Sequence, residues 1–440
     1  MSKLDTLHAL STKLDEAEGH MVTLDRYYAG EQPLTFLAPE AKEALGDRFA
    51  RMCSNIPRLA VTSLAERLRV TGFHRNGSTD PDLWAAWVRN DLDQLAPVAH
   101  REALTLGRSF ALVWADHRGR SQVSIESARQ TTVLRDPATR EVVAGLKRWV
   151  SAGRGHAVLY EADQITRYVS HAHVVDAAAM PPTAWDVAET IPNPLGTVPL
   201  VPLVNTDRLL DTDGRSELAD LLPLVDGLNK SLADLMVASE YFARPRRWAT
   251  GVELVVDDET GEATNPFPEG NRMMISEGHE SKFGQLPAAD LAAYESGVKV
   301  LLGQIMAVSA LPAHYVGIFT DNPTSADSLR AAEASLAARA EARQATFGRA
   351  WEQVARLMAA IDTDTDPDQI EIGVTWSDPA TRSIAQEADA IVKLHASGIL
   401  PTSFALARLG YTSDEIDEIR AARRAEALDT AGIDLKALTA

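Results

Sequence analysis

A short β-type insert between two apolar helical stretches is the feature that most constrains how this chain can fold. Apolar residues recur at helical spacing up to Phe242, and Pro223 is expected either to start a new helical segment or to kink the helix. A second helix is predicted over 291–309, before Pro312. The intervening residues 248–284 contain short β-type runs around a DDETGE turn. If the two helices run antiparallel, the insert projects from their far end as a small module on a two-helix stalk.

The region before this stalk predicts helices followed by a sheet. Residues 1–110 have helical apolar spacing, whereas short β-type runs begin at Phe110 and continue to about Val169. The turns between these runs are too short for crossover helices, so we expect a mostly antiparallel sheet. The region ends in NPLGTVPLVPLVN (193–205), whose three prolines predict an extended edge segment rather than a central strand.

The region after the stalk predicts one long helix, one strand and a helical end. The long helix is expected over 326–361, with Thr324 and Asp327 forming a capping box at its start. IEIGVTW, which ends at Trp376, predicts a late strand, and the chain beyond about 378 has helical character. The fold class expected from this order of elements is α+β.

The charge balance limits the kinds of partner. The chain has 62 acidic and 43 basic residues, a net charge of −19, whereas a tight DNA binder displays a basic footprint. A surface past which DNA slides remains compatible, since like charges keep the polymer off the wall. The single cysteine, Cys53, allows no internal disulfide and fits a reducing cytoplasm. We find no signal peptide and no apolar run of membrane-spanning length.

The sequence contains no recognisable catalytic motif, such as a Walker loop, HExxH, CxxC or nucleophile elbow. His171 and His173 would share one face of an extended segment, but no third metal ligand is nearby. The Asp run at 362–368 resembles the start of a calcium loop, yet Pro367 replaces the glycine and Gly373 the glutamate that such a loop needs. We interpret the run as a solvated turn, with a weak cation site as the alternative. No enzyme activity, cofactor or metal is therefore expected.

The order and spacing of several segments resemble the portal proteins of tailed bacteriophages of the siphophage type. The similar segments are LDRYYAGEQPL and CSNIPRLAVTSLAERLRVTGF near the start, NPLGTVPLVPLVN, GRSELADLLPLVDGLNKSLADLMVASEYFARPRRW, NPTSADSLRAAEASLAARAEARQATFGRAWEQV, and WSDPATRSIAQEADAIVKLHASGILPTSFALARLGYTSDEI. They cover most of the chain. The resemblance implies a portal-like fold with the following parts: a wing with helices and an antiparallel sheet (1–214), a first stem helix (215–243), a β-containing clip (244–288), a second stem helix (289–310), a tunnel loop (311–325), a long wing helix with the late strand (326–377), and a helical crown (378–440).

The same resemblance implies a function and a set of partners. Portal proteins form a ring of twelve subunits at one capsid vertex, with a central channel for packaging and ejection of double-stranded DNA. The implied partners are further copies of the chain, the terminase large subunit of the packaging motor, the head–tail adaptor, the major capsid and scaffolding proteins, and DNA passing without sequence specificity. Assembly would occur in the host bacterial cytoplasm, with no membrane involved. The alternative is another oligomeric virion or scaffold protein without a DNA channel.

Three groups of candidate site residues follow from this comparison. The group expected to pack the stem is Leu228, Leu232 and Leu235. A tight basic cluster at the clip, expected to contact the motor or an adjacent subunit, is Arg244, Arg246 and Arg247. A solvated helix end is the alternative for this cluster.

The third group belongs to the tunnel loop. Its members are His314, Tyr315, Phe319, Thr320, Asp321 and Asn322. Residues 311–323 contain no Lys or Arg, so the loop is expected to narrow the channel without holding DNA phosphates. Leu311 and Val316 are expected instead to pack against the stem.

Overall fold

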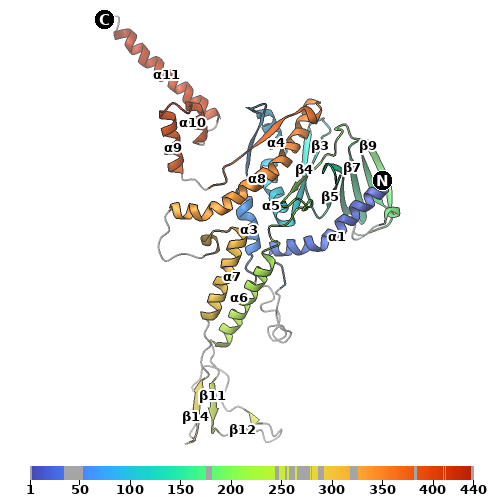
Figure 1. The fold of residues 1–440 in the computed structure, drawn as a ribbon, viewed down its shortest axis with the longest axis vertical. Coiled ribbons are helices and arrows are strands. Elements are labelled where there is room, and N and C mark those ends of the chain that lie inside the picture. The colour runs from blue at the N-terminus through green and yellow to red at the C-terminus, as the bar shows by residue number, and fades with distance from the viewer. Residues whose placement is uncertain are drawn as a thin grey trace. The chain divides into compact units, whose positions relative to one another are not determined.

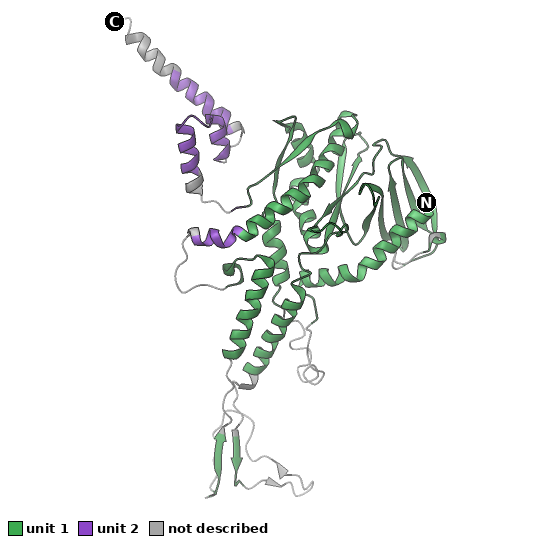
Figure 2. Ribbon diagram, in the orientation of Figure 1, with its two compact units in different colours: residues 1–321, 335–379 green, residues 322–334, 380–440 purple. Residues whose placement is uncertain are grey.

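The computed structural model describes most of the chain. The described residues are 2–33, 53–174, 181–242, 247–252, 255–256, 263–264, 278, 280–285, 292–317, 326–380, 384–409, 411 and 413–437. The chain divides into two compact units, drawn in different colours in Figure 2. The first contains 1–321 and 335–379, and the second contains 322–334 and 380–440.

The predicted β region of the first unit folds into two antiparallel sheets rather than one. The first sheet has the order β10-β3-β4, with β3 at Arg108–Ala115, β4 at Ser121–Ser127 and β10 at Leu200–Val204. The second has the order β5-β6-β7-β8-β9, with bounds Thr131–Arg135, Val142–Ser151, Arg154–Glu161, Gln164–Ser170 and Trp185–Pro192. β10 lies at the edge of its sheet, which confirms the prediction made from its prolines.

The two sheets meet where Gly145 of β6 faces Leu200 of β10. A Cβ atom at Gly145 would lie 2.7 Å from Leu200 Cδ2, so a larger residue there would require the Leu200 side chain to shift. The prediction of one sheet was wrong, because β5 does not pair with β4 and instead starts a second sheet with β6. β9 was not predicted. It is an edge strand, and five consecutive residues of it are exposed.

A third, smaller sheet joins the two ends of the first unit. β15 (Ile372–Trp376) pairs antiparallel with β1 (Val70–Arg75), which also pairs with the short β2 (Ser78–Thr79). The late strand is therefore confirmed. The expectation that residues 1–110 are helical missed β1, because a strand whose partner lies near the other end of the unit gives little local signal.

Helices cover these sheets and supply the main core. Their bounds are α1 Lys3–Ala29, α3 Ile56–Ala65, α4 Pro81–Arg89, α5 Leu92–Leu106 and α8 Ala326–Thr363. α1 lies along the five-stranded sheet (Figure 1) and buries Leu7, Leu10 and Leu14 against Leu146, Leu159, Tyr168 and Trp185. The predicted long helix is confirmed, but its capping box lies outside the residues whose side chains are described.

The two stalk helices form an antiparallel pair (Figure 1). α6 spans Leu222–Phe242 and α7 spans Ala292–Ser309, so Pro223 starts α6 and does not kink it. Between them, β11 (Arg247–Thr250) pairs antiparallel with β14 (Lys282–Gln285). A second short pair joins β12 (Val255–Val256) and β13 (Ala263–Thr264).

The remaining elements are short or belong to the second unit. Three 3₁₀ turns lie at Pro182–Ala184, Ala313–Val316 and Pro367–Gln369. The second unit contains α9 (Ile384–Ala396), α10 (Thr402–Arg408) and α11 (Ser413–Ala437), as its helical pattern predicted. None of the described helices combines the length and apolar content needed to cross a membrane.

Candidate functional site

The end of the helix pair at which α6 begins and α7 ends is packed into the core of its own chain. Leu228 is buried on α6, and Ile305 is buried on α7. Leu232 is half-buried against the same core, and Leu235 is half-buried farther along α6. The three predicted stem residues therefore face the interior to different degrees, and Leu228 is the one that the chain itself covers completely.

The rest of the pair exposes apolar surface. α7 has 18 residues and two charged side chains, Glu295 and Lys299, whose charged groups lie 2.6 Å apart. Only Ile305 and Ser309 of this helix are buried, and Val300 is 64% exposed. A mostly uncharged helix in a folded protein normally lies against other apolar surface. Within one chain, Val298, Leu301 and Leu302 of α7 are partly buried against the core, whereas Val300 stays exposed.

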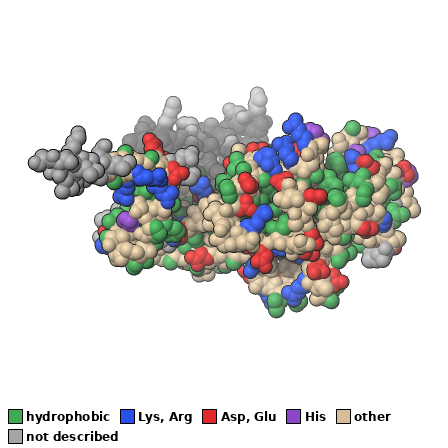
Figure 3. Space-filling model, turned by 90° about the horizontal axis from the view of Figure 1, so that it is seen from above, with side chains coloured by type: hydrophobic (Ala, Val, Ile, Leu, Met, Phe, Trp, Pro, Cys, Tyr) green, Lys and Arg blue, Asp and Glu red, His purple; other side chains and the backbone are tan. Residues whose placement is uncertain are grey.

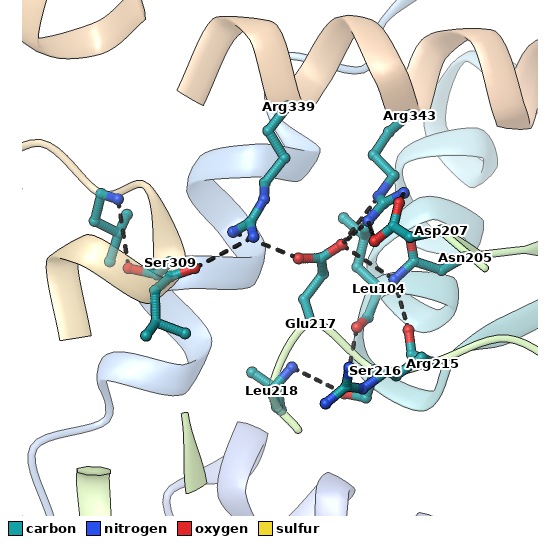
Figure 4. Close-up of polar contacts among 12 residues, drawn as sticks. Leu104, Asn205, Asp207, Arg215, Ser216, Glu217, Leu218, Ser309, Arg339 and Arg343 are labelled. Atoms are coloured by element: carbon teal, nitrogen blue, oxygen red, sulfur yellow. Dashed lines mark hydrogen bonds and ion pairs between the residues drawn. The ribbon is translucent and has the colours of Figure 1, made fainter. Parts of the chain in front are cut away.

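A cluster of charged side chains, two of them buried, holds the segment before α6 to α8 (Figure 4). The Arg343 guanidinium donates to Glu217 Oε1 from Nε at 2.9 Å and from Nη2 at 2.7 Å. It also donates to both carboxylate oxygens of Asp207, at 2.6 and 2.8 Å. The side chains of Arg343 and Glu217 are 4% and 8% exposed. We call Arg343, Glu217, Asp207 and Arg339 the anchor cluster.

Electrostatics within the anchor cluster favour the charged forms of Arg343 and Asp207. Burial alone would lower the pKa of Arg343, but hydrogen bonds and the negative charges of Asp207 and Glu217 raise it. The hydrogen bonds from Arg343 likewise lower the pKa of Asp207. The buried Arg343–Glu217 pair is thus compensated at its solvent-facing side by Asp207, whose side chain is 72% exposed.

Arg339 extends the anchor cluster to the second stalk helix. Its Nη2 donates to the Val308 carbonyl in the last turn of α7 at 3.2 Å, and its Nη1 lies 3.7 Å from Glu217 Oε2. One face of α8 therefore contacts both the residue that precedes α6 and the end of α7. Sequence reasoning missed this cluster, although the spacing of Arg339 and Arg343 on one face of a buried helix was an available signal.

The predicted tunnel-loop residues are only partly described. Leu311 is buried and Val316 packs against the main core, and their expected packing against the stem stays a prediction. The Tyr315 hydroxyl accepts a hydrogen bond from Arg67 Nη2 at 3.2 Å, and the half-buried His314 ring meets the Tyr315 ring edge-on at 4.8 Å. The other predicted members, Phe319, Thr320, Asp321 and Asn322, lie outside the described residues.

Of the three predicted clip arginines, the structure describes only a part of one. Arg244 and Arg246 lie outside the described residues, and of Arg247 only the backbone is described, as the first residue of β11. Their expected contacts therefore stay a prediction.

The other candidates take structural roles. The Asp362 carboxylate accepts from Ser121 N at 2.7 Å and pairs with Arg89 at 3.1 Å. Asp366 caps the short 3₁₀ turn through Asp368 N. His171 Nδ1 lies 3.1 Å from a carboxylate oxygen of Asp186. Among the described residues, no group of three or more His, Cys, Asp or Glu side chains is placed to hold a metal ion.

Comparison with known proteins gives both a family and a fold. Residues 7–428 match the family model described as phage portal protein, SPP1 Gp6-like. The portal protein of Mycobacterium phage L5 is 31% identical over 389 residues, which is 83% of this chain and 77% of that protein. The portal protein of Mycobacterium phage D29 is 31% identical over 386 residues, with the same coverage.

Solved structures give the fold independently. A chain in the virion of the native gene transfer agent particle aligns with a TM-score of 0.50 at 14% identity, over 89% of this chain and 93% of that one. A chain in the neck of the empty gene transfer agent particle, computed with C6 symmetry, aligns with a TM-score of 0.51 at 13% identity, over 89% and 94%. At these identities the likeness concerns the fold alone.

Proposed function

Since the chain belongs to the SPP1 Gp6-like family of phage portal proteins, we propose that its copies form a closed ring of twelve subunits around an axial channel. Through this channel, double-stranded DNA would enter the capsid at one vertex during packaging and leave it at ejection. Portal proteins are structural components of phage particles, so the chain has no need of an active site of its own. The rival interpretation, a virion protein without a channel, has no support in the relatives it resembles.

The observation that carries the ring is the exposed apolar surface of the helix pair. α7 buries only two of its 18 residues within its own chain, and Met236 on α6 is also 46% exposed. In a ring, the neighbouring subunit's helix pair would cover these residues. Apolar surface of this kind drives association because its burial removes it from water.

The ring is tested by its mass and symmetry. Val300→Asp places a charge on the exposed face of α7, which costs nothing in the separate chain but would be buried without a partner between subunits. We expect closed rings in electron micrographs of the unmodified chain and mostly monomers for the variant. Leu228→Asp serves as contrast, because Leu228 is 1% exposed and the variant should lose the fold as well. Rings of unchanged yield from Val300→Asp would contradict subunit packing through α7.

For DNA passage we propose a channel that repels rather than grips. The net charge of −19 and the absence of Lys and Arg in 311–323 support this proposal. On the face drawn in Figure 3, acidic and basic side chains are interspersed with apolar ones. Asp321→Lys should slow translocation at low salt and recover partly at high salt, because added phosphate attraction is screened. A salt-independent rate equal to that of the unmodified ring would remove this loop from the DNA path.

For the clip we propose contacts to the packaging motor's terminase large subunit or to an adjacent subunit through Arg244, Arg246 and Arg247. Their position between α6 and the paired strands β11 and β14 supports this, since a module at the far end of the helix pair is open to partners. Charge reversal at Arg246 and Arg247 should lower packaging with a purified motor. Unchanged packaging would leave a solvated helix end as the explanation. The head–tail adaptor, capsid and scaffold are further proposed partners on family grounds.

A further inference from the structure

The loop that leads from β10 to α6, residues 205–216, is fixed at both ends. Asn205 N donates to Gly107 O at 2.8 Å, and Arg215 N donates to Asn205 O at 2.7 Å. Gly214, with φ of 79°, lies so close to Gly107 that a Cβ atom there would be 2.0 Å from the Gly107 carbonyl oxygen. The Asp207 carboxylate accepts two hydrogen bonds from Arg343 of the anchor cluster. Residues 208–212 therefore project from a rigid base.

This loop carries the two most exposed large apolar side chains among the described residues. Leu209 is 78% exposed and Leu210 is 90% exposed. A single exposed leucine is ordinary, but two adjacent leucines held outward by a fixed loop form a concentrated apolar tip. Because both side chains stay exposed, they contribute almost nothing to the folding free energy of the separate chain.

Beside this tip lies a cavity of about 560 Å³ between the loop and the turn that joins β5 to β6. Its lining is Arg135, Arg140, Val204, Thr206, Asp207, Arg208, Leu209, Asp211 and Thr212. Arg135 Nη1 donates to the Arg140 carbonyl oxygen at 3.1 Å, and burial lowers the Arg135 pKa although the charge of Asp213 opposes this.

The charges of this cavity are only partly balanced within the chain. None of its three arginine side chains forms an ion pair with a carboxylate in the described part of the structure, where such pairs are otherwise frequent. Of the two lining carboxylates, Asp207 is already held by Arg343, which leaves Asp211 beside three guanidinium groups. The cavity thus has capacity for external carboxylates.

We propose that this surface, the leucine tip together with the arginine cavity, receives a second copy of this chain through an apolar segment that carries carboxylates. The inference rests on the proposed ring. Charge complementarity supports this occupant, because the chain has 19 more acidic than basic residues. The adjoining leucines favour a protein over a nucleic acid, since apolar tips suit the dry centre of a protein interface. A closed ring joins two different patches at each contact, so this surface would be one of the pair.

The test compares the stability of the ring in matched variants. Leu209→Ser/Leu210→Ser removes the tip, and Arg140→Glu/Arg208→Glu reverses the exposed charges of the cavity. Mass photometry over a dilution series should show that each double variant needs at least tenfold more protein to form rings. The salt dependence of the charge variant should be the reverse of that of the unmodified ring, because added salt then screens a repulsion between the new glutamates and the partner's carboxylates. Thermal unfolding of the separated chain should stay unchanged, since the substituted side chains are exposed.

Two controls separate the possible failures. Arg118→Glu/Val187→Ser makes a like change at exposed positions elsewhere and should leave ring formation at its original concentration. A photocrosslinking amino acid in place of Leu210 should join two chains within purified rings. If the unmodified chain forms no rings, the proposed function fails. If it forms rings that both double variants reproduce at the same concentration, or rings whose position 210 joins no second chain, the proposed function stands and this inference is overturned.

Discussion

The second half of α8 and the stalk helix α7 are both rich in apolar residues, yet the chain treats them in opposite ways. Phe347, Trp351 and Val354 of α8 are fully buried, whereas α7 buries only Ile305 and Ser309. The difference shows where one chain completes its own core and where it leaves apolar surface for another molecule. Helical pattern alone does not distinguish the two cases, because it reports a face and not what covers it.

The α8 side of this comparison rests on aromatic packing against α4 and α5. The Trp351 ring meets the Trp87 ring edge-on, with ring centroids 5.0 Å apart. His100 of α5 stacks on Phe347 at 5.4 Å, and its Nε2 accepts a hydrogen bond from Trp351 Nε1 at 2.7 Å. Because an indole N–H can only donate, the neutral imidazole carries its proton on Nδ1.

The largest effect is expected from Trp351→Ala. It removes a fully buried ring and leaves a cavity, which should lower the free energy of unfolding by about 3–5 kcal/mol. Urea denaturation of the separated chain, followed by circular dichroism, would measure this. Trp351→Phe keeps most of the volume and should lose clearly less. Equal losses of unfolding free energy from the two variants would mean that the buried volume of the Trp351 side chain does not determine the stability of the α8 core.

The next effect concerns the anchor cluster, where α8 meets the helix pair. Arg343→Met leaves the Glu217 carboxylate buried without its main partner and should cost about 3 kcal/mol. Adding Glu217→Gln removes the stranded charge and should recover part of this loss. Equilibrium denaturation of the two variants makes the comparison. A double variant that is less stable than Arg343→Met would show that the carboxylate retains adequate partners without the guanidinium.

A smaller effect should appear as a pH dependence of the α8 core. Burial lowers the pKa of His100 to about 3, while the unfolded chain titrates near the ordinary value of 6.5. Between these values the unfolded state binds the extra proton, so stability is present above about pH 6.5 and declines as the pH falls. The loss attributable to His100 should reach about 2 kcal/mol at pH 5.

The contribution of His100 can be isolated by His100→Gln, which does not titrate and keeps an acceptor for the Trp351 indole. Its stability should fall less between pH 7 and pH 5 than that of the unmodified chain. Parallel profiles of stability against pH for the two proteins would show that His100 is not the source of the pH dependence.

The smallest effect belongs to the other side of the comparison. Met236→Ser on α6 replaces a side chain that is 46% exposed and should change the unfolding free energy of the separated chain by less than about 0.5 kcal/mol. In an assembled ring the same substitution should lower the dissociation temperature. If the free energy of unfolding of the separated chain fell by several kcal/mol, the helix pair α6–α7 would depend on its apolar residues within one chain as α8 does.

Sequence reasoning succeeded where patterns are local. The bounds of α7 were predicted to within a residue, those of α8 to within two, and the prolines of β10 placed it correctly at a sheet edge. It failed where pairing is distant. β1 has its partner in β15, about three hundred residues later, and whether β5 pairs with β4 or with β6 is not marked by any local pattern.

The candidate site shows the same limit. Leu228, predicted from its spacing to pack the stem, is buried within its own chain, and its role in a stem stays a prediction. The anchor cluster joins Arg343 to two acidic residues more than a hundred positions earlier, and no local pattern marks such a partnership. The family was identified from the order and spacing of several segments. Those segments span most of the chain, whereas a local pattern describes only one element at a time.

The exposed strand β9 has a consequence for how copies of this chain can meet. An open sheet edge is a template on which a further strand can add, and accumulation of such additions leads to aggregation. β9 carries Asp186 and Glu189, and its last residue, Pro192, lacks an N–H donor. A second β9 laid alongside would find the ladder of donors interrupted at Pro192. The edge thus discourages open-ended growth by strand addition and leaves association to surfaces that can close on themselves.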